Sequence, residues 1–298
     1  DVLRLNSGRS AFFYAAIEAN IKTIYLPFFT CEETSQPFEK LGIEIKYYFL
    51  DDDLLPKNIN LGDNDFMFWT NYYGNATHQQ KEFINQNYKN LVIDNCHAFF
   101  SKPNPLAYNC YSTRKFFGVS DGAYLINKKI YNEMSIPKDT SYQNIQHLIK
   151  QIDLGINDAY KENLNNEKRL CDDFKRMSSF TEKLLKTIDY ANIKKTRRKN
   201  FLLMNKLLGD KNHFPINIES DTHMYYPFLT NKENLRHELI KKYLYNPFWW
   251  RHVLDLVPEN TIEYHLSKYT VMLPIDQRYN EKEIYDICEL VESCLEKC

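Results

Sequence analysis

The sequence lacks a charge imbalance, a long apolar run and any Cys-x-x-Cys pair. Its 298 residues carry 38 Lys and Arg against 39 Asp and Glu, which gives a formal net charge of −1. A chain this close to neutral has no polyelectrolyte character, so we expect neither nucleic acid nor a membrane surface as a partner. No signal peptide or transmembrane run is visible in these residues, and we therefore expect a cytoplasmic protein.

The cysteines are odd in number and scattered, which argues for reduced thiols and against a disulfide framework or a zinc site. The seven are Cys31, Cys96, Cys110, Cys171, Cys288, Cys294 and Cys298. No internal repeat or low-complexity linker divides the chain, and 298 residues suffice for one large domain and a smaller one.

The pattern of apolar residues predicts an α/β fold. Short apolar runs alternate with helical patterns through about residue 127, as in a mainly parallel sheet covered by helices on both faces. The predicted strands are 23–26, 43–49, 66–69, 91–93 and 124–126, and the predicted helices are 10–19, 31–41 and 79–87. Residues 141–208 have a helical, charged pattern. Strands at 215–218 and 223–229 with helices at 232–243 and 281–296 then predict a small α+β domain, so we divide the chain into 1–190 and 191–298.

The most informative pattern joins Asp94, His97 and Lys115. Asp94 and His97 follow a short apolar strand, and Lys115 lies 21 residues after Asp94, behind a second short strand. A carboxylate that keeps a pyridine nitrogen protonated, and an amine that binds an aldehyde, are what a pyridoxal phosphate (PLP) site needs. Phe116 and Phe117 give the amine an apolar setting. In parallel sheets ligands bind beyond the carboxyl ends of the strands, where Asp94 lies.

Each residue also has a plainer interpretation. Asp94 alone would be a turn or helix-cap residue, His97 a buried core histidine, and Lys115 a solvated loop lysine. Their combination favours the cofactor role. The tripeptide Gly8-Arg9-Ser10 is by itself only a helix start, although the N–H groups of such a start can bind a phosphate, with Arg9 and Ser10 as additions.

Other conspicuous residues are given structural roles. We interpret Arg114 as a surface charge and the basic run 194–199 as a solvated helix face. We assign residues 248–251 to the core or a dimer contact, with a contact between Trp249 and a sugar nucleotide as the lesser alternative. Arg278 is assigned to bracing a turn rather than to binding a substrate carboxylate.

Over nearly its whole length the chain resembles the DegT/DnrJ-type sugar aminotransferases of PLP fold type I. The resemblance implies a mainly parallel, seven-stranded large domain and a smaller α+β domain. It places Gly8, Arg9 and Ser10 beneath the cofactor phosphate, Asp94 at the ring nitrogen, His97 near the phenolic oxygen and Lys115 on the aldehyde. The motifs that carry it are Asn6-Ser7-Gly8-Arg9-Ser10-Ala11, Leu26-Pro27-Phe28-Phe29-Thr30, Tyr72-Tyr73-Gly74, Ile93-Asp94-Asn95-Cys96-His97-Ala98, Lys115 seven residues before Gly122, and Leu273-Pro274-Ile275-Asp276-Gln277-Arg278-Tyr279.

The chain departs from the family pattern at two cysteines. Cys31 stands where many members place an aromatic residue that stacks on the cofactor ring, and Tyr73 or Phe29 are the alternatives. Cys110 stands where members have a phosphate-binding serine, five residues before the lysine, and Ser112 is the nearer hydroxyl. The chain is also shorter than typical members.

The resemblance implies a PLP-dependent aminotransferase that moves an amino group from glutamate to a nucleotide-linked keto sugar, in surface-glycan or related biosynthesis. It also implies a homodimer, and Lys115 would act as general base and acid. Two alternatives stay open. One is a different PLP reaction on a sugar, against which Lys115 argues because such members tend to carry histidine there. The other is an inactive relative that acts as a binding or regulatory partner, which Cys31, Cys110 and the short chain would permit.

Overall fold

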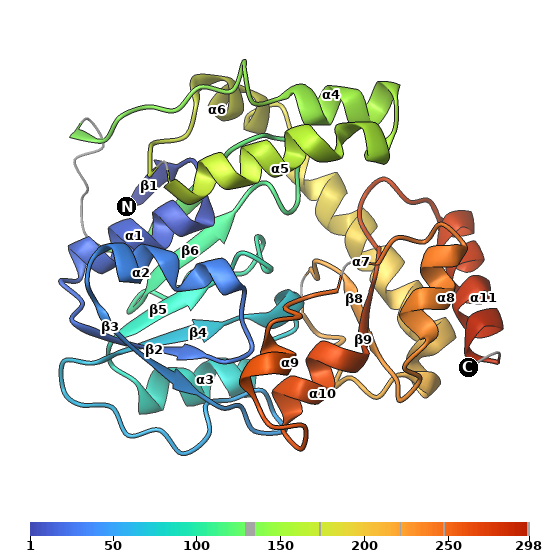
Figure 1. The fold of residues 1–298 in the computed structure, drawn as a ribbon, viewed down its shortest axis with the longest axis horizontal. Coiled ribbons are helices and arrows are strands. Elements are labelled where there is room, and N and C mark those ends of the chain that lie inside the picture. Colours follow the sequence, from blue (N-terminus) through green and yellow to red (C-terminus); the bar gives the residue numbers. More distant parts are fainter. Residues whose placement is uncertain (129–134, 173, 221, 247, 297–298) are drawn as a thin grey trace.

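The computed structural model describes residues 1–128, 135–172, 174–220, 222–246 and 248–296. Its larger part is built on a seven-stranded sheet with the strand order β1-β7-β6-β5-β4-β2-β3 (Figure 1). Strands β2 to β6 are parallel to one another, whereas β7 is antiparallel to both β6 and β1. The strands are β1 (Val2–Leu5), β2 (Thr23–Pro27), β3 (Glu44–Tyr48), β4 (Phe66–Thr70), β5 (Leu91–Asp94), β6 (Tyr108–Ser112) and β7 (Ala123–Ile126). The prediction of a mainly parallel α/β sheet is confirmed.

Both faces of this sheet are buried. Within β4, Met67 and Trp69 belong to one hydrophobic core and Phe68 to the other, because successive strand residues point to opposite faces. Helices α1 (Gly8–Glu18) and α2 (Gln36–Lys40) pack on the face of Phe68. Helix α3 (His78–Asn87) and residues from the C-terminal third cover the other face.

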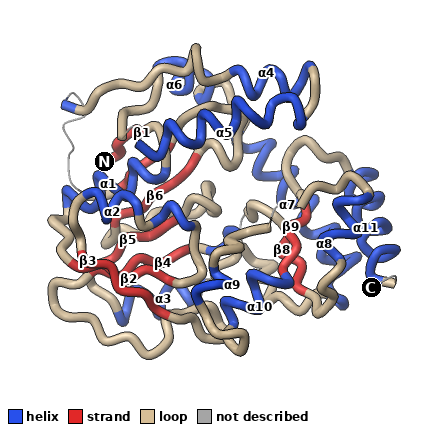
Figure 2. The backbone as a smooth tube through the Cα atoms, viewed as in Figure 1, coloured by secondary structure: helices blue, strands red, loops and turns tan. Residues whose placement is uncertain are grey.

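Four helices connect this sheet to a second, smaller unit. Helices α4 (Gln146–Asp153), α5 (Ile156–Asp172) and α6 (Ser179–Leu185) lie across the top of Figure 1, and α7 (Tyr190–Leu208) leads to the second unit. There β8 (Tyr226–Leu229) pairs antiparallel with β9 (Thr270–Leu273), and α8 (Leu235–Lys241) and α11 (Glu281–Leu295) pack beside them (Figure 2). The short helices α9 (Val253–Leu256) and α10 (Ile262–Tyr269) lie between this unit and the large sheet. The division at residue 190 stays a prediction.

The five strands predicted before residue 127 and the helices at 10–19 and 79–87 are confirmed, within a few residues at their ends. The helix predicted at 31–41 is split into a 3-10 turn, Glu32–Thr34, and α2, which has Pro37 in its first turn. Strand β1, strand β9 and helices α9 and α10 were not anticipated.

The strand predicted at 215–218 is wrong. Its backbone bonds to a side chain instead of to a neighbouring strand: Asn75 Nδ2 donates to the Pro215 carbonyl at 2.8 Å, and Asn75 Oδ1 accepts from the Asn217 N–H at 2.8 Å. The six cysteines within the described residues are free thiols, and Cys298 lies outside these residues.

Candidate active site

Lys115 and His97 meet above the carboxyl ends of β5 and β6. The Nζ of Lys115 lies 3.0 Å from Nε2 of His97 and 5.3 Å from the ring centroid of Trp249. His97 is 3% exposed, and its Nδ1 is buried without a hydrogen-bond partner. Burial, and then the charge of Lys115, lower the pKa of His97 well below its usual value. A neutral His97 can accept a hydrogen bond from Nζ of Lys115.

Asp94 is the last residue of β5 and points to the face covered by α1. Leu91 and Ile93 lie in the opposite core, so the alternation of the strand turns Asp94 toward the helix start. Its Oδ1 accepts the N–H of Cys96 at 2.8 Å. Burial raises the pKa of this carboxyl group, while Cys96 and Lys115 oppose the rise. A bound cation would lower that pKa again.

The first turn of α1 comes against the loop that follows Asp94. A Cβ added to Gly8 would lie 2.9 Å from Sγ of Cys96, so only glycine fits without movement. Ser7 caps the helix by accepting the N–H of Ser10. The side chain of Ser10 is fully buried and donates to Oδ1 of Asn6 at 2.5 Å. The N–H groups of Gly8 and Arg9, in the first turn, have no acceptor within the helix.

Strand β6 places Cys110 and Ser112 on the same face of the sheet, because they are two residues apart in the strand. Cys110 pairs with Asp94 across the strands and is fully buried, as part of the core under α1. Ser112 is the last residue of the strand and lines the cavity described below. Cys110 and Ser112 were the two candidates for contact with a phosphate. Ser112 is the one that lies at the open end of the strand.

Cys31 donates its thiol to Oε2 of Glu33, 2.6 Å away. Burial, followed by the charge of Glu33, raises the pKa of Cys31 to about 12, so the thiol stays protonated at neutral pH. The side chain of Cys31 is therefore small and uncharged.

Aromatic side chains enclose His97. The ring of Tyr73 is nearly parallel to that of His97, with centroids 5.7 Å apart, and Trp250 is also parallel to it at 5.7 Å. Trp249 meets His97 edge to face at 4.8 Å. Tyr73 itself is fully buried and Phe29 is 1% exposed.

These elements surround one cavity of about 240 Å³. Seven of the ten residues assigned from the sequence line it: Gly8, Arg9, Cys31, Asp94, His97, Ser112 and Lys115. The other three, Ser10, Tyr73 and Cys110, are fully buried and do not line it. Residues that the sequence did not indicate also line it, among them Glu33, Arg114, Glu167 and Trp250.

The interpretation of Arg114 as a surface charge is wrong. Only 16% of its side chain is exposed, and it forms an ion pair with Glu167 of α5. Within the basic run 194–199, the solvated interpretation is also wrong for Arg197, which is 3% exposed and donates to the Met224 carbonyl at 3.0 Å. Arg278 makes a two-point ion pair with Asp276, in agreement with a bracing role.

Lys115 also lines a second cavity, of about 400 Å³. Arg114 and Lys115 line both cavities, so the lysine stands at their junction. The polar groups of the second cavity come from the C-terminal half and from α4: Gln151, Arg197, Tyr225, Asp276, Gln277 and Arg278.

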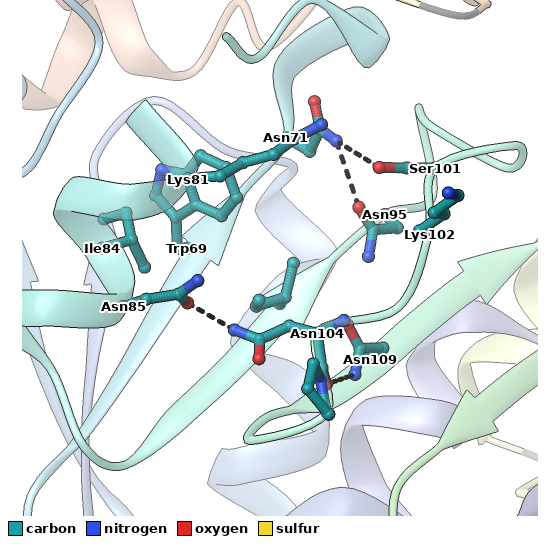
Figure 3. A pocket seen from close by; sticks show the side chains of 12 residues that line it. Trp69, Asn71, Lys81, Ile84, Asn85, Asn95, Ser101, Lys102, Asn104 and Asn109 are labelled. Atoms are coloured by element: carbon teal, nitrogen blue, oxygen red, sulfur yellow. Dashed lines mark hydrogen bonds between the residues drawn. The ribbon is translucent and has the colours of Figure 1, made fainter. Parts of the chain in front are cut away.

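A third cavity lies on the opposite face of the sheet (Figure 3). It measures about 180 Å³ and is lined by Trp69 and several amide side chains, of which Asn71 donates to Asn95 at 3.2 Å. None of the assigned residues lines it. Among the described residues there is also no His, Cys, Asp and Glu cluster suited to a metal ion, and no helix long and apolar enough to cross a membrane.

No protein-family model and no curated protein matches the chain. Its structure is similar to solved aminotransferase structures. Spr1654 from Streptococcus pneumoniae, assigned as a sugar aminotransferase and solved in its PLP form, is 13% identical with a TM-score of 0.68, over 99% of this chain and 87% of that one. PseC from Helicobacter pylori, an aminotransferase involved in pseudoaminic acid biosynthesis, is 12% identical with a TM-score of 0.65, over 100% and 87%. CalS13 from Micromonospora echinospora, a sugar aminotransferase, is 13% identical with a TM-score of 0.65, over 98% and 87%. At these identities the similarity establishes the fold, which is the one that the sequence resemblance implied.

Proposed function

We propose that the protein is a PLP-dependent aminotransferase of the DegT/DnrJ type that acts on a keto sugar. The observation that carries this proposal is the single cavity in which Lys115, His97, Asp94 and the start of α1 converge. An amine, a buried carboxylate and a helix start at the carboxyl edge of a mainly parallel sheet are the groups that PLP requires.

The residues of the cavity fit this cofactor. Asp94 would hold the ring nitrogen, since a buried carboxylate with no cation at ion-pair distance among the described residues gains from a protonated nitrogen. The helix start at Gly8 and the hydroxyl of Ser112 would hold the phosphate. Trp250 lines the cavity beside the small Cys31 and would supply the aromatic face. When bound, PLP would supply an electron sink and an aldehyde for the amine of Lys115.

Proton transfer is assigned to Lys115, with His97 as the residue that positions it. Lys115 would take the proton from the α carbon of the amino donor as general base and deliver it as general acid to the carbon supplied by the cofactor's aldehyde. His97 orients the Lys115 amine through the 3.0 Å contact, and its burial keeps it neutral, so it does not add a competing charge. The rings of Trp249 and Trp250 cover His97 on its side of this contact, whereas Lys115 itself is exposed to solvent.

The second cavity is the proposed site of the sugar. It reaches Lys115 directly, and its lining of arginine, tyrosine and amide groups suits a polar, anionic substrate such as a nucleotide-linked keto sugar. Glutamate is the proposed amino donor. The names of the structural neighbours, which are sugar aminotransferases, support this choice of substrate class. We also infer a homodimer and a cytoplasmic location, and sedimentation velocity tests the dimer as a species of twice the 35.6 kDa chain.

The decisive measurement is the visible absorption spectrum of the purified protein with PLP, before and after glutamate is added. We expect a band that Lys115→Ala abolishes and that glutamate removes with release of 2-oxoglutarate. Lys89→Ala, at an exposed lysine remote from the cavity, should behave as the unchanged protein. A protein that gives no such band would be a binding or regulatory relative, and a band that no amino donor alters would indicate different PLP chemistry.

A further inference from the structure

A triad of charged side chains lies in the cavity that Lys115 and Ser112 line. Arg9, the second residue of α1, and Arg114, the residue before Lys115, both point to Glu167 of α5. Nη2 of Arg9 lies 3.4 Å from Oε2 of Glu167, and Nη1 of Arg114 lies 3.5 Å from the same atom. All three residues line the cavity that also contains Lys115 and Ser112.

This triad is unbalanced in charge. Two guanidinium groups share one carboxylate, and both arginine side chains are mostly buried, 13% and 16% exposed. Burial, and then the neighbouring Arg9, lower the pKa of Arg114 to about 10, which still leaves it charged at neutral pH. The Nε group of Arg114 is buried without a hydrogen-bond partner. Two convergent cations with an unused donor form a site for an anion of higher charge than one carboxylate.

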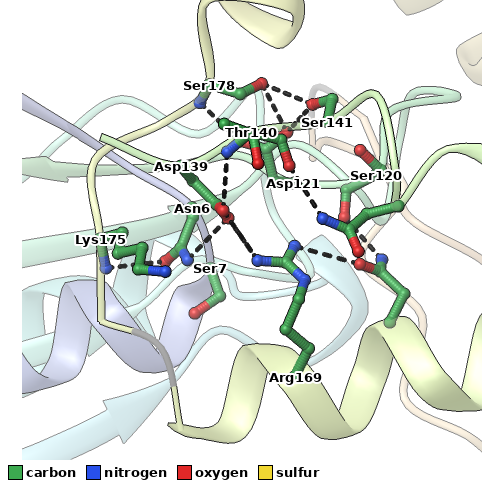
Figure 4. A network of polar contacts seen from close by, with 12 residues as sticks. Asn6, Ser7, Ser120, Asp121, Asp139, Thr140, Ser141, Arg169, Lys175 and Ser178 are labelled. Carbon is green, nitrogen blue, oxygen red and sulfur yellow. Dashed lines mark hydrogen bonds and ion pairs between the residues drawn. The ribbon is translucent and has the colours of Figure 1, made fainter. Parts of the chain in front are cut away.

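Glu167 differs from the arginines in its freedom to move. Its side chain is 39% exposed, so it can turn toward solvent at little cost. The helix that carries it is fixed on both sides of this residue: Asn166 donates to the Ser120 carbonyl at 2.7 Å, and Arg169 forms an ion pair with Asp139 (Figure 4). Asp139 also accepts from Asn6, which lies two residues before α1 (Figure 4). The helix therefore holds Glu167 at the cavity while its side chain remains movable.

We propose that Arg9 and Arg114 bind the phosphate of the cofactor, and that Glu167 is an internal anion which occupies their guanidinium groups until the phosphate displaces it. This inference rests on the proposed function in that it takes PLP as the cofactor. In the absence of ligand Glu167 relieves the repulsion between the two arginines. In its presence the phosphate dianion takes both, and the carboxylate turns outward because two anions at the same cations repel each other.

The test measures equilibrium binding of three ligands to the protein freed of cofactor: inorganic phosphate, PLP, and pyridoxal, which lacks the phosphate. The variant Glu167→Gln keeps the hydrogen-bond acceptor and removes the competing charge, so phosphate and PLP should bind about tenfold tighter while pyridoxal is unaffected. Arg114→Gln should weaken phosphate and PLP by about tenfold or more. In the double variant that combines Arg114→Gln with Glu167→Gln, the gain in phosphate and PLP affinity caused by Glu167→Gln should be largely lost.

Asp158→Asn is the matched control. Asp158 lies in the first turn of the same helix, is exposed and does not line the cavity, so its variant should bind all three ligands as the unchanged protein does. Unaltered or weaker phosphate and PLP binding in Glu167→Gln would overturn the proposal, as would equal effects on pyridoxal. The phosphate arm is independent of Lys115. Loss of the proposed function, seen as a PLP spectrum without the Lys115-dependent band, would therefore be distinct from failure of this anion site.

Discussion

Two buried histidines, His97 and His223, are held neutral by the fold. His223 is fully buried, stacks on Phe201 with ring centroids 3.5 Å apart, and lies 3.2 Å from Oδ1 of Asn75 through Nε2. Burial, and then the charge of Arg198, lower the pKa of His223 to about 3. Both histidines pack at the contact between the large sheet and the C-terminal half, so their protonation opposes the folded state there.

The stability of the protein should therefore fall as the pH falls below 6.5. Below that value the unfolded chain binds a proton at His223 that the folded protein does not bind until about pH 3. Between pH 6.5 and 5 this residue alone costs about 2 kcal/mol of unfolding free energy. Urea unfolding measured at pH 7 and pH 5 gives the unfolding free energy at each pH. The decrease between the two should be smaller in His223→Gln than in the unchanged protein by about that amount. His78→Gln, whose side chain is 80% exposed, is the control, and equal pH dependence in His223→Gln would contradict the assignment.

For single residues, the sequence predicts a place in the candidate site where the neighbouring residues along the chain form a recognisable pattern. Asp94 ends a short strand and Lys115 follows another, so their places at the sheet edge could be predicted. Glu167 and Trp250 come to the same cavity from a surface-patterned helix and from a segment near the C-terminus. Their contribution depends on tertiary packing between distant segments, which a single sequence does not specify.

Among the elements, the loop after Lys115 is fixed by one buried carboxylate. Asp121 is fully buried and accepts from the N–H and hydroxyl of Ser178, at 2.7 and 2.9 Å, and from the hydroxyl of Ser141 at 2.7 Å. Ser178 is the N-cap of α6, so the loop is tied to a helix start (Figure 4). Gly122, with a φ of 128°, then lets the chain turn back so that its N–H donates to the Asn6 carbonyl at 2.6 Å.

The variant Asp121→Asn should cost about 3 kcal/mol of unfolding free energy, because it removes the charge from several buried hydrogen bonds at once. We also expect a looser hold on PLP, since the loop that begins at Lys115 loses its anchor. Chemical denaturation gives the first quantity and a PLP titration the second. Asp189→Asn, at the N-cap of α7, is the matched change and should be close to neutral because Asn caps as well as Asp. A similar small effect at both positions would contradict the anchoring role.

Element predictions succeeded where the apolar pattern matched a complete strand or helix, as in β4 and β5. They failed where side chains replaced backbone pairing. Residues 215–217 are apolar in part, yet their hydrogen bonds go to Asn75. Strand β9 was missed because it is only four residues long and directly follows α10, so no turn residue separates it from the helical pattern.

For the whole molecule, the cavity belongs to both halves of the chain. The large sheet supplies Asp94, and Trp250 comes from the C-terminal half. The halves are also joined directly, because the Met224 N–H donates to the Tyr73 carbonyl at 2.8 Å. A ligand in this cavity therefore contacts both halves, and its binding energy should couple their unfolding.

Binding of PLP should accordingly raise the thermal stability of the whole chain. At 100 times its dissociation constant a ligand that binds only the folded state adds about 2.7 kcal/mol, which for a chain of this size raises the melting temperature by roughly 5 °C. Circular dichroism reports mainly on helices and strands, whereas two of the three tryptophans, Trp249 and Trp250, lie beside His97 at the junction. Both signals should shift together in the unchanged protein and much less in Lys115→Ala. A shift of the tryptophan signal alone would mean that the cofactor stabilises the junction without coupling the two halves, and would contradict the shared cavity as the link between them.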